Sequence, residues 1–176
     1  MLAGLTEEAI ALAGACHWPT GAAESSHFTV RSLERPRDSV PDDDPAIARY
    51  LRALHAAAAR SKPIGLRLVG VTMPDSCVMA CAEPVDTAVE DFAASFAVEL
   101  GEDDWHERGF DRDIWYASLV HFAGPVERPE ELIEWVGERR RVDSGVSVAV
   151  GAQLVEWRWG GSGVVPRVVA EMPFGG

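Results

Sequence analysis

Two short stretches that alternate polar and apolar residues constrain the fold of this chain most strongly. They are Ser26–Val30 and Trp115–Val120. Alternation is the pattern of a strand with one buried face, because successive side chains of a strand point to opposite sides. It places His27 and Thr29 on one face of the first strand. In the second strand it places Tyr116 and Ser118 together. The sequence thus predicts two strands that each present a ring and a hydroxyl.

These four residues have two interpretations. A lone histidine in a strand is more often structural than catalytic, and tyrosine and serine are ordinary residues of a sheet. The functional alternative requires the two strands to lie side by side. They would then form a cleft with two rings and two hydroxyls, suited to one small anion.

Periodicity in the rest of the chain predicts helices and strands in two similar halves. The helices are expected at about 6–15, 45–60, 84–100 and 129–141, and the strands at 26–33, 64–72, 76–82, 115–123, 146–150, 153–159 and 164–172. No segment rich in Pro, Gly or Ser divides the halves into independent domains. We therefore expect one α+β domain over residues 1–176, with two lobes, mostly antiparallel strands, helices outside and a central cleft.

Composition narrows the class of protein. The 176 residues are 47% hydrophobic and carry a net charge of −12, which is typical of a globular chain that repels long nucleic acid. A single phosphate in a cleft is compatible with that charge.

The cysteines and the apolar segments bear on location. Three cysteines without metal-site spacing suit a reducing cytoplasm. The first residues lack a basic signal-peptide region and no apolar run is long enough to span a membrane, so we expect a cytoplasmic protein.

Two polar segments have alternative roles. Asp42–Asp44 lacks the spaced ligands and glycine of a calcium loop, so we expect it to be solvated and to cap the following helix. Residues 101–113 include two arginines and form either a lid over a ligand or a surface connection. Residues 160–163 are expected to form a hairpin turn. The candidate site itself offers no carboxylate–histidine cluster, so the sequence predicts no metal.

The residues around the two stretches resemble the two-histidine (2H) phosphoesterases, the 2′-5′ RNA ligase-like superfamily. That family carries two motifs of the form H-x-[ST]-h, where h is apolar. His27-Phe28-Thr29-Val30 fits the first motif in full, and Tyr116-Ala117-Ser118-Leu119 fits the second except for its histidine. The resemblance implies a pseudo-twofold bilobal fold with the motifs facing each other across the cleft. The family also begins with a strand. Here only Met1–Leu5 could supply it at the start of the chain, and the alternative is that the final strand fills its place.

The resemblance implies chemistry on a small cyclic or 2′-5′-linked nucleotide phosphate, without a cofactor. His27 would act as general base or acid, while Thr29 and Ser118 would bind the phosphate oxygens. Tyr116 occupies the second histidine's place as the other catalytic residue. A phenol there can donate a hydrogen bond to phosphate or a proton as the acid, but is a poor base at pH 7. Strand alternation places His121 on the other face. The alternatives are a non-hydrolytic module that binds a nucleotide or another anion, and an enzyme of this fold with altered chemistry on a non-nucleotide substrate.

Overall fold

The computed structural model describes residues 1–110, 112–159 and 164–175; Asp111 of the polar 101–113 segment and the expected turn at 160–163 lie outside these ranges. The elements within them, in chain order, are α1 (Leu2–Ala13), α2 (Pro45–Ala58), β1 (Ile64–Thr72), β2 (Cys77–Pro84), α3 (Ala88–Leu100), the 3₁₀ helix η1 (Gly101–His106), β3 (Trp115–His121), α4 (Pro129–Glu138), β4 (Val146–Ala149), β5 (Gly151–Trp159) and β6 (Val164–Pro173).

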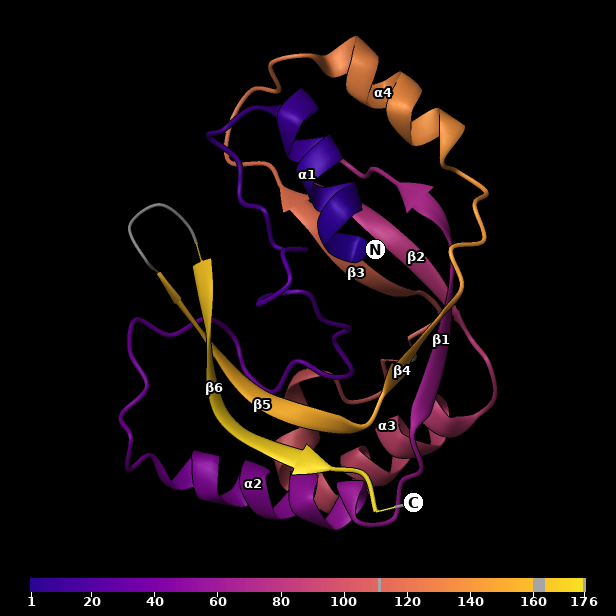
Figure 1. The fold of residues 1–176 in the computed structure, drawn as a ribbon. Helices are drawn as coiled ribbons and strands as arrows, with labels where there is room; N and C mark the ends of the chain where they lie inside the picture. The colour runs from indigo at the N-terminus through magenta and orange to yellow at the C-terminus, as the bar shows by residue number, and fades with distance from the viewer. Residues whose placement is uncertain (111, 160–163, 176) are drawn as a thin grey trace.

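The strands form two antiparallel sheets. One has the order β3-β2-β1-β4, and the other is the β5-β6 pair. Helix α1 packs on β3 and on α4, whereas α2 packs on β5, β6 and α3. The long strand β1 contacts both α4 and α3 and so connects the two groups (Figure 1). The predicted α+β class with antiparallel strands is confirmed. None of the helices in the described ranges has the length and apolar character needed to cross a bilayer.

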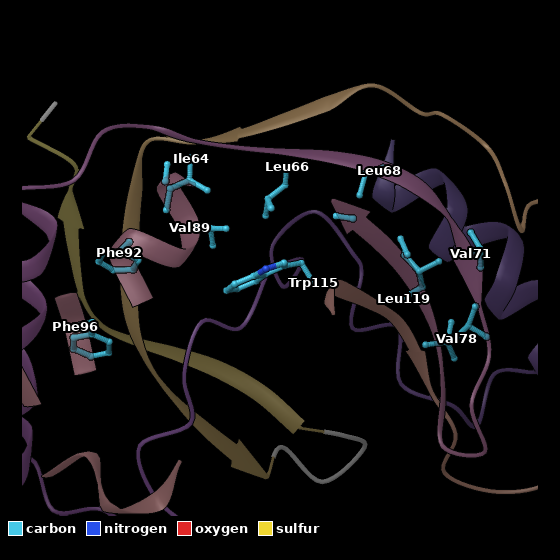
Figure 2. Packing of buried hydrophobic residues seen from close by; sticks show 14 of the residues in the cluster. Ile64, Leu66, Leu68, Val71, Val78, Val89, Phe92, Phe96, Trp115 and Leu119 are labelled. Atoms are coloured by element: carbon cyan, nitrogen blue, oxygen red, sulfur yellow. The ribbon is translucent and has the colours of Figure 1, made fainter. Parts of the chain in front are cut away.

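One continuous apolar core joins both groups of elements. Leu66 and Val71 of β1, Leu119 of β3 and Phe92 of α3 all contribute to it (Figure 2). The largest fully buried side chains are Phe92, Leu68, Leu119, Leu132, Val78, Val89 and Val120. Burial of this apolar area is the main favourable term in folding, and it fixes α1 against β3 and α4.

Two helices begin at positions that differ from the sequence prediction. Helix α1 starts at Leu2, and Thr6 is buried inside it with its hydroxyl donating to the Leu2 carbonyl at 3.0 Å. Since Met1–Leu5 are therefore not a strand, the family's initial strand is not found there. Helix α3 starts at Ala88 because Pro84 still belongs to β2, and the Asp86 carboxylate accepts from the Ala88 N–H at 2.9 Å.

The start of α2 agrees with the prediction for the aspartate run. The Asp44 carboxylate accepts from the Ala46 N–H at 2.8 Å. That hydrogen bond, followed by the bond from Arg37, lowers the pKa of Asp44. The capping role of this residue is confirmed, and the helix dipole adds to it.

Tyr50 of α2 fastens the segment after His27 to the core. Its side chain is buried and its hydroxyl donates to Glu34 at 2.7 Å. Burial, and then the Glu34 carboxylate, raises the pKa of Tyr50. The folded chain therefore keeps this proton at a pH where an unfolded tyrosine, with a pKa near 10, has lost it.

We expect Tyr50→Phe to reduce the free energy of unfolding by about 1–3 kcal/mol at pH 7, because a buried bond to a carboxylate is lost. The stabilisation from this proton should be complete below about pH 10 and should fall as the pH rises further. Urea denaturation of both proteins at about pH 7 and pH 11 measures this. A difference that stays constant between the two pH values would contradict the assignment.

Candidate functional site

The chain just before His27 is attached to the open edge of β3. Trp18 and His121 exchange two backbone hydrogen bonds, at 3.0 and 2.9 Å, and the Gly21 N–H donates to the Leu119 carbonyl at 2.9 Å. Residues 18–21 thereby extend the four-stranded sheet by a short length of chain. The residues that lead into the first motif are held directly against the strand that carries the second.

Gly21 makes this close approach possible. A Cβ atom at this position would lie 2.9 Å from the Leu119 Cα and even closer to the hydroxyl of Thr6. The Leu119 contact is to backbone, which cannot move aside as the end of a side chain can. Only glycine fits between α1 and β3 here.

We expect Gly21→Ala to destabilise the fold by about 1–3 kcal/mol, the usual cost of overpacking a tight site. The same change should displace residues 18–21 from β3. Thermal unfolding measures the first effect, and the amide chemical shifts of Trp18 and His121 measure the second. Gly4→Ala is the matched control, because a Cβ at Gly4 meets nothing within 4 Å. Equal stability of the two variants would show that residues 18–21 have room to move.

The first motif is not a strand, in contrast to the sequence prediction for residues 26–33. Within the described ranges, residues 27–33 take part in no backbone ladder. Residues 18–21 already cover part of the edge of β3, so the segment that follows does not pair there with the strand that carries the second motif. Side chains hold the segment instead. Arg31, for example, donates to Asp104 at 2.5 Å and to the Glu107 carbonyl at 3.2 Å.

His27 is half-buried and has one ring nitrogen engaged. Its Nδ1–H donates to the Ser25 carbonyl at 2.7 Å, and its ring centroid lies 5.0 Å from that of Trp157 on β5. Its Nε2 has no hydrogen-bond partner in the described part of the chain and is not a buried atom. Because a carbonyl can only accept, Nδ1 carries a proton. Nε2 is therefore free to exchange a proton with a ligand.

A cleft of about 1320 Å³ runs along this segment. Its walls come from residues 26–40 and from residues 147–158 of β4, β5 and their connection. His27 and Thr29 line it, while Tyr116 and Ser118 do not. The volume is ample for a nucleotide-sized molecule, since ligand sites commonly measure about 300–1,000 Å³.

A β-bulge in β3 decides which side chains share a face. Tyr116 pairs with Cys81, Ser118 with Met79 and His121 with Cys77, and the register shifts between Ser118 and Val120. The three partners are alternate residues of β2 and therefore lie on one face. Tyr116, Ser118 and His121 consequently share that face as well, because β3 accommodates one extra residue.

The opposite face of β3 belongs to the core. Leu119 and Val120 are adjacent in sequence and both fully buried, as two neighbours at a bulge can be. The prediction that His121 lies on the face of β3 opposite Tyr116 is therefore wrong. It assumed an unbroken strand, and the bulge is a feature of pairing with β2.

His121 contacts Thr20, in the segment that precedes the first motif, and its pKa responds to the charge of His27. Its Nδ1 lies 3.0 Å from the Thr20 hydroxyl, and the same hydroxyl donates to the Ser118 carbonyl at 3.4 Å. Burial lowers the pKa of His121, and the charge of His27 lowers it further. The ring of His121 is thus near enough to His27 to feel its charge. No local pattern in the sequence indicates Thr20, and the family pattern has no histidine at position 121.

The three predicted hydroxyl groups are unengaged. Within the described residues, the side-chain oxygens of Tyr116, Ser118 and Thr29 make no hydrogen bond, and none is a buried unpartnered atom. They are therefore open to a ligand or to water. No hydrogen bond, ion pair or ring contact joins His27 to Tyr116 in the described ranges. Convergence of all four residues on one phosphate stays a prediction.

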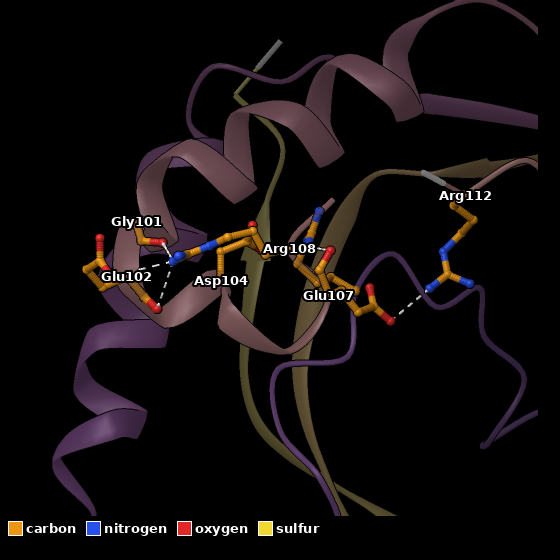
Figure 3. Close-up of polar contacts among 7 residues, drawn as sticks. Gly101, Glu102, Asp104, Glu107, Arg108 and Arg112 are labelled. Atoms are coloured by element: carbon orange, nitrogen blue, oxygen red, sulfur yellow. Dashed lines mark hydrogen bonds and ion pairs between the residues drawn. The ribbon is translucent and has the colours of Figure 1, made fainter. Parts of the chain in front are cut away.

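The polar segment after α3 is anchored to the rest of the chain. Arg49 of α2 binds Asp103 through two hydrogen bonds of 2.7 and 3.0 Å, and Arg31 binds Asp104. Within the segment, Arg108 donates to the carbonyls of Gly101 and Glu102 while Arg112 pairs with Glu107 (Figure 3). These contacts tie η1 to the segment that carries His27.

The fold is similar to that of a solved protein. The crystal structure of TT0787 of Thermus thermophilus superposes with a TM-score of 0.57 at 24% sequence identity, and the match covers 86% of this chain and 79% of that chain. The sequence matches no protein-family model and no curated protein. The two proteins therefore share a fold over most of their lengths.

Proposed function

We propose that this protein is a divergent 2H phosphoesterase that hydrolyses a small cyclic or 2′-5′-linked nucleotide phosphate. The observation that carries the proposal is the state of His27: Nδ1 is bonded to the Ser25 carbonyl while Nε2 is open beside a ligand-sized cleft. This is the arrangement of an imidazole that moves a proton. The full first motif and the likeness of fold to TT0787 over most of both chains support it.

The residues would divide the reaction as follows. Water attacks the phosphorus and loses a proton to a base, while one ester bond breaks and the departing ribose oxygen receives a proton from an acid. His27 serves as one of these two groups. Thr29, Ser118 and Tyr116 donate hydrogen bonds to the non-bridging oxygens, where charge builds up in the transition state. The net charge of −12 favours a small substrate over polymeric RNA.

A direct assay tests the function. The purified chain is incubated with 2′,3′-cyclic mononucleotides and 2′-5′-linked dinucleotides, and ³¹P NMR follows the appearance of a phosphomonoester. We expect turnover that persists in EDTA, because the proposed groups are imidazoles and hydroxyls. Absence of turnover for every substrate would overturn the proposal. Loss in EDTA with recovery in zinc or magnesium would instead show that a metal takes part.

The second candidate is a binding module with the same cleft, and Tyr116 is the observation that favours it. A phenol at the place of the second motif histidine removes an acid–base group that the family uses. Isothermal titration with a non-hydrolysable nucleotide analogue, run beside the turnover assay, separates the two candidates. Tight binding without turnover supports the module or an enzyme with a different substrate.

A further inference from the structure

We propose that His121, oriented by Thr20, is the general base of this site and that His27 is its general acid. The inference rests on the proposed function and names the missing second imidazole. Tyr116 keeps the place of the motif histidine in sequence but would serve only as a hydrogen-bond donor to phosphate.

The bulge in β3 provides the position. It returns His121 to the face that carries Tyr116 and Ser118, although an odd number of positions separates His121 from each of them. The two backbone hydrogen bonds between His121 and Trp18 then place this ring beside the chain that leads to His27. Nε2 of His121 makes no hydrogen bond within the described residues and is not a buried unpartnered atom. Nε2 is therefore the nitrogen of this ring that remains for a proton of the substrate or of water.

Thr20 sets the tautomer of His121. The Ser118 carbonyl can only accept, so the single hydroxyl hydrogen of Thr20 is directed to it. In the proposed state the Thr20 oxygen accepts at its other contact, of 3.0 Å, from the Nδ1–H of His121. With the proton on Nδ1, the lone pair of His121 lies on Nε2. Thr20 is buried, so water does not compete with the contacts of its hydroxyl with Ser118 and His121.

The electrostatics fit the same division of roles. Burial lowers the pKa of His121 and the charge of His27 lowers it further, which favours the neutral form of this ring. In the described part of the chain, His27 is the only charged side chain that shifts this pKa. A neutral imidazole with an open Nε2 is a base, and the proposal gives the complementary role of acid to His27.

The proposed hydrolysis balances in atoms and electrons. Nε2 of His121 takes a proton from water as the water oxygen bonds to phosphorus. The bond from phosphorus to one ribose oxygen breaks, its electron pair goes to that oxygen, and the oxygen takes the Nε2 proton of His27. One water and one cyclic phosphodiester give one phosphomonoester. Solvent returns both histidines to their starting states.

The test compares His121→Asn with Tyr116→Phe. The asparagine amide can take the place of Nδ1–H and donate to Thr20, whereas nothing replaces Nε2. We expect His121→Asn to lower kcat/KM by about 10²–10⁴-fold and to remove the acidic limb of the pH–rate profile. Tyr116→Phe should lower kcat but keep that limb.

The role of Thr20 is tested in the same assay. Thr20→Val should also weaken the acidic limb of the pH–rate profile, and Thr20→Ser should restore it. His55→Asn, at an exposed position of α2, is the control.

A titration of the histidine rings by NMR gives a readout independent of turnover. In His27→Asn the pKa of His121 should rise, because the neighbouring charge is gone. In His55→Asn it should not change. An unchanged pKa in both variants, or turnover by His121→Asn within about twofold of wild type while His27→Asn is inactive, overturns the role of His121 and leaves the proposed function standing. Absence of wild-type turnover overturns the proposed function itself.

Discussion

Replacing His27 with asparagine should lower kcat/KM for a 2′,3′-cyclic nucleotide by about 10²–10⁴-fold, the usual contribution of one acid–base group. This corresponds to roughly 3–5 kcal/mol of transition-state stabilisation. The asparagine amide can still donate to the Ser25 carbonyl, as the Nδ1–H of His27 does at 2.7 Å. Only Nε2 is lost. The variant therefore tests the loss of proton transfer while the segment around residue 27 keeps its position.

Steady-state kinetics and a thermal unfolding curve measured on the same preparation give the result. We expect a large loss in kcat with little change in the unfolding temperature, because the ring is only half-buried. His55→Asn should leave both quantities unchanged. If His27→Asn were as active as wild type, any phosphodiesterase activity would have to come from a different site.

Phe92→Ala should cause the largest loss of stability, about 3–5 kcal/mol, the usual cost of truncating a buried aromatic residue. Its side chain is 2% exposed. Its ring is stacked on Phe96 with centroids 6.1 Å apart and meets Phe174 edge-on at 5.1 Å. Phe174 follows β6, so the cavity would loosen the contact of α3 with the end of the β5-β6 pair.

Urea denaturation of Phe92→Ala measures this loss. Val98→Ala is the matched control, since Val98 lies on the same helix but is 77% exposed. We expect that control to change the free energy of unfolding by about 0.5 kcal/mol or less. A Phe92→Ala protein within about 1 kcal/mol of wild type would mean that the core around α3 closes over the gap.

The sequence alone determined the elements whose signals are local. The periodic spacing of apolar residues located α2, β1, β3 and the later strands, and the aspartate before Pro45 marked a helix start that the Asp44 side chain caps. These features depend on neighbours within a few residues, which is the range over which side-chain periodicity and capping act. The α+β class followed from their order.

The tertiary structure decided whatever depends on partners distant in sequence. Residues 26–33 have the alternation of a strand but pair with no other strand in the described ranges, and His27 is positioned by Ser25 and Trp157 instead. The face of His121 was set by a bulge, which arises when β3 pairs with β2 and leaves no mark in the residues of β3. Its contact with Thr20 exists only after the chain folds back along the edge of β3. Alternation within one strand cannot register an extra residue that only the pairing of two strands creates.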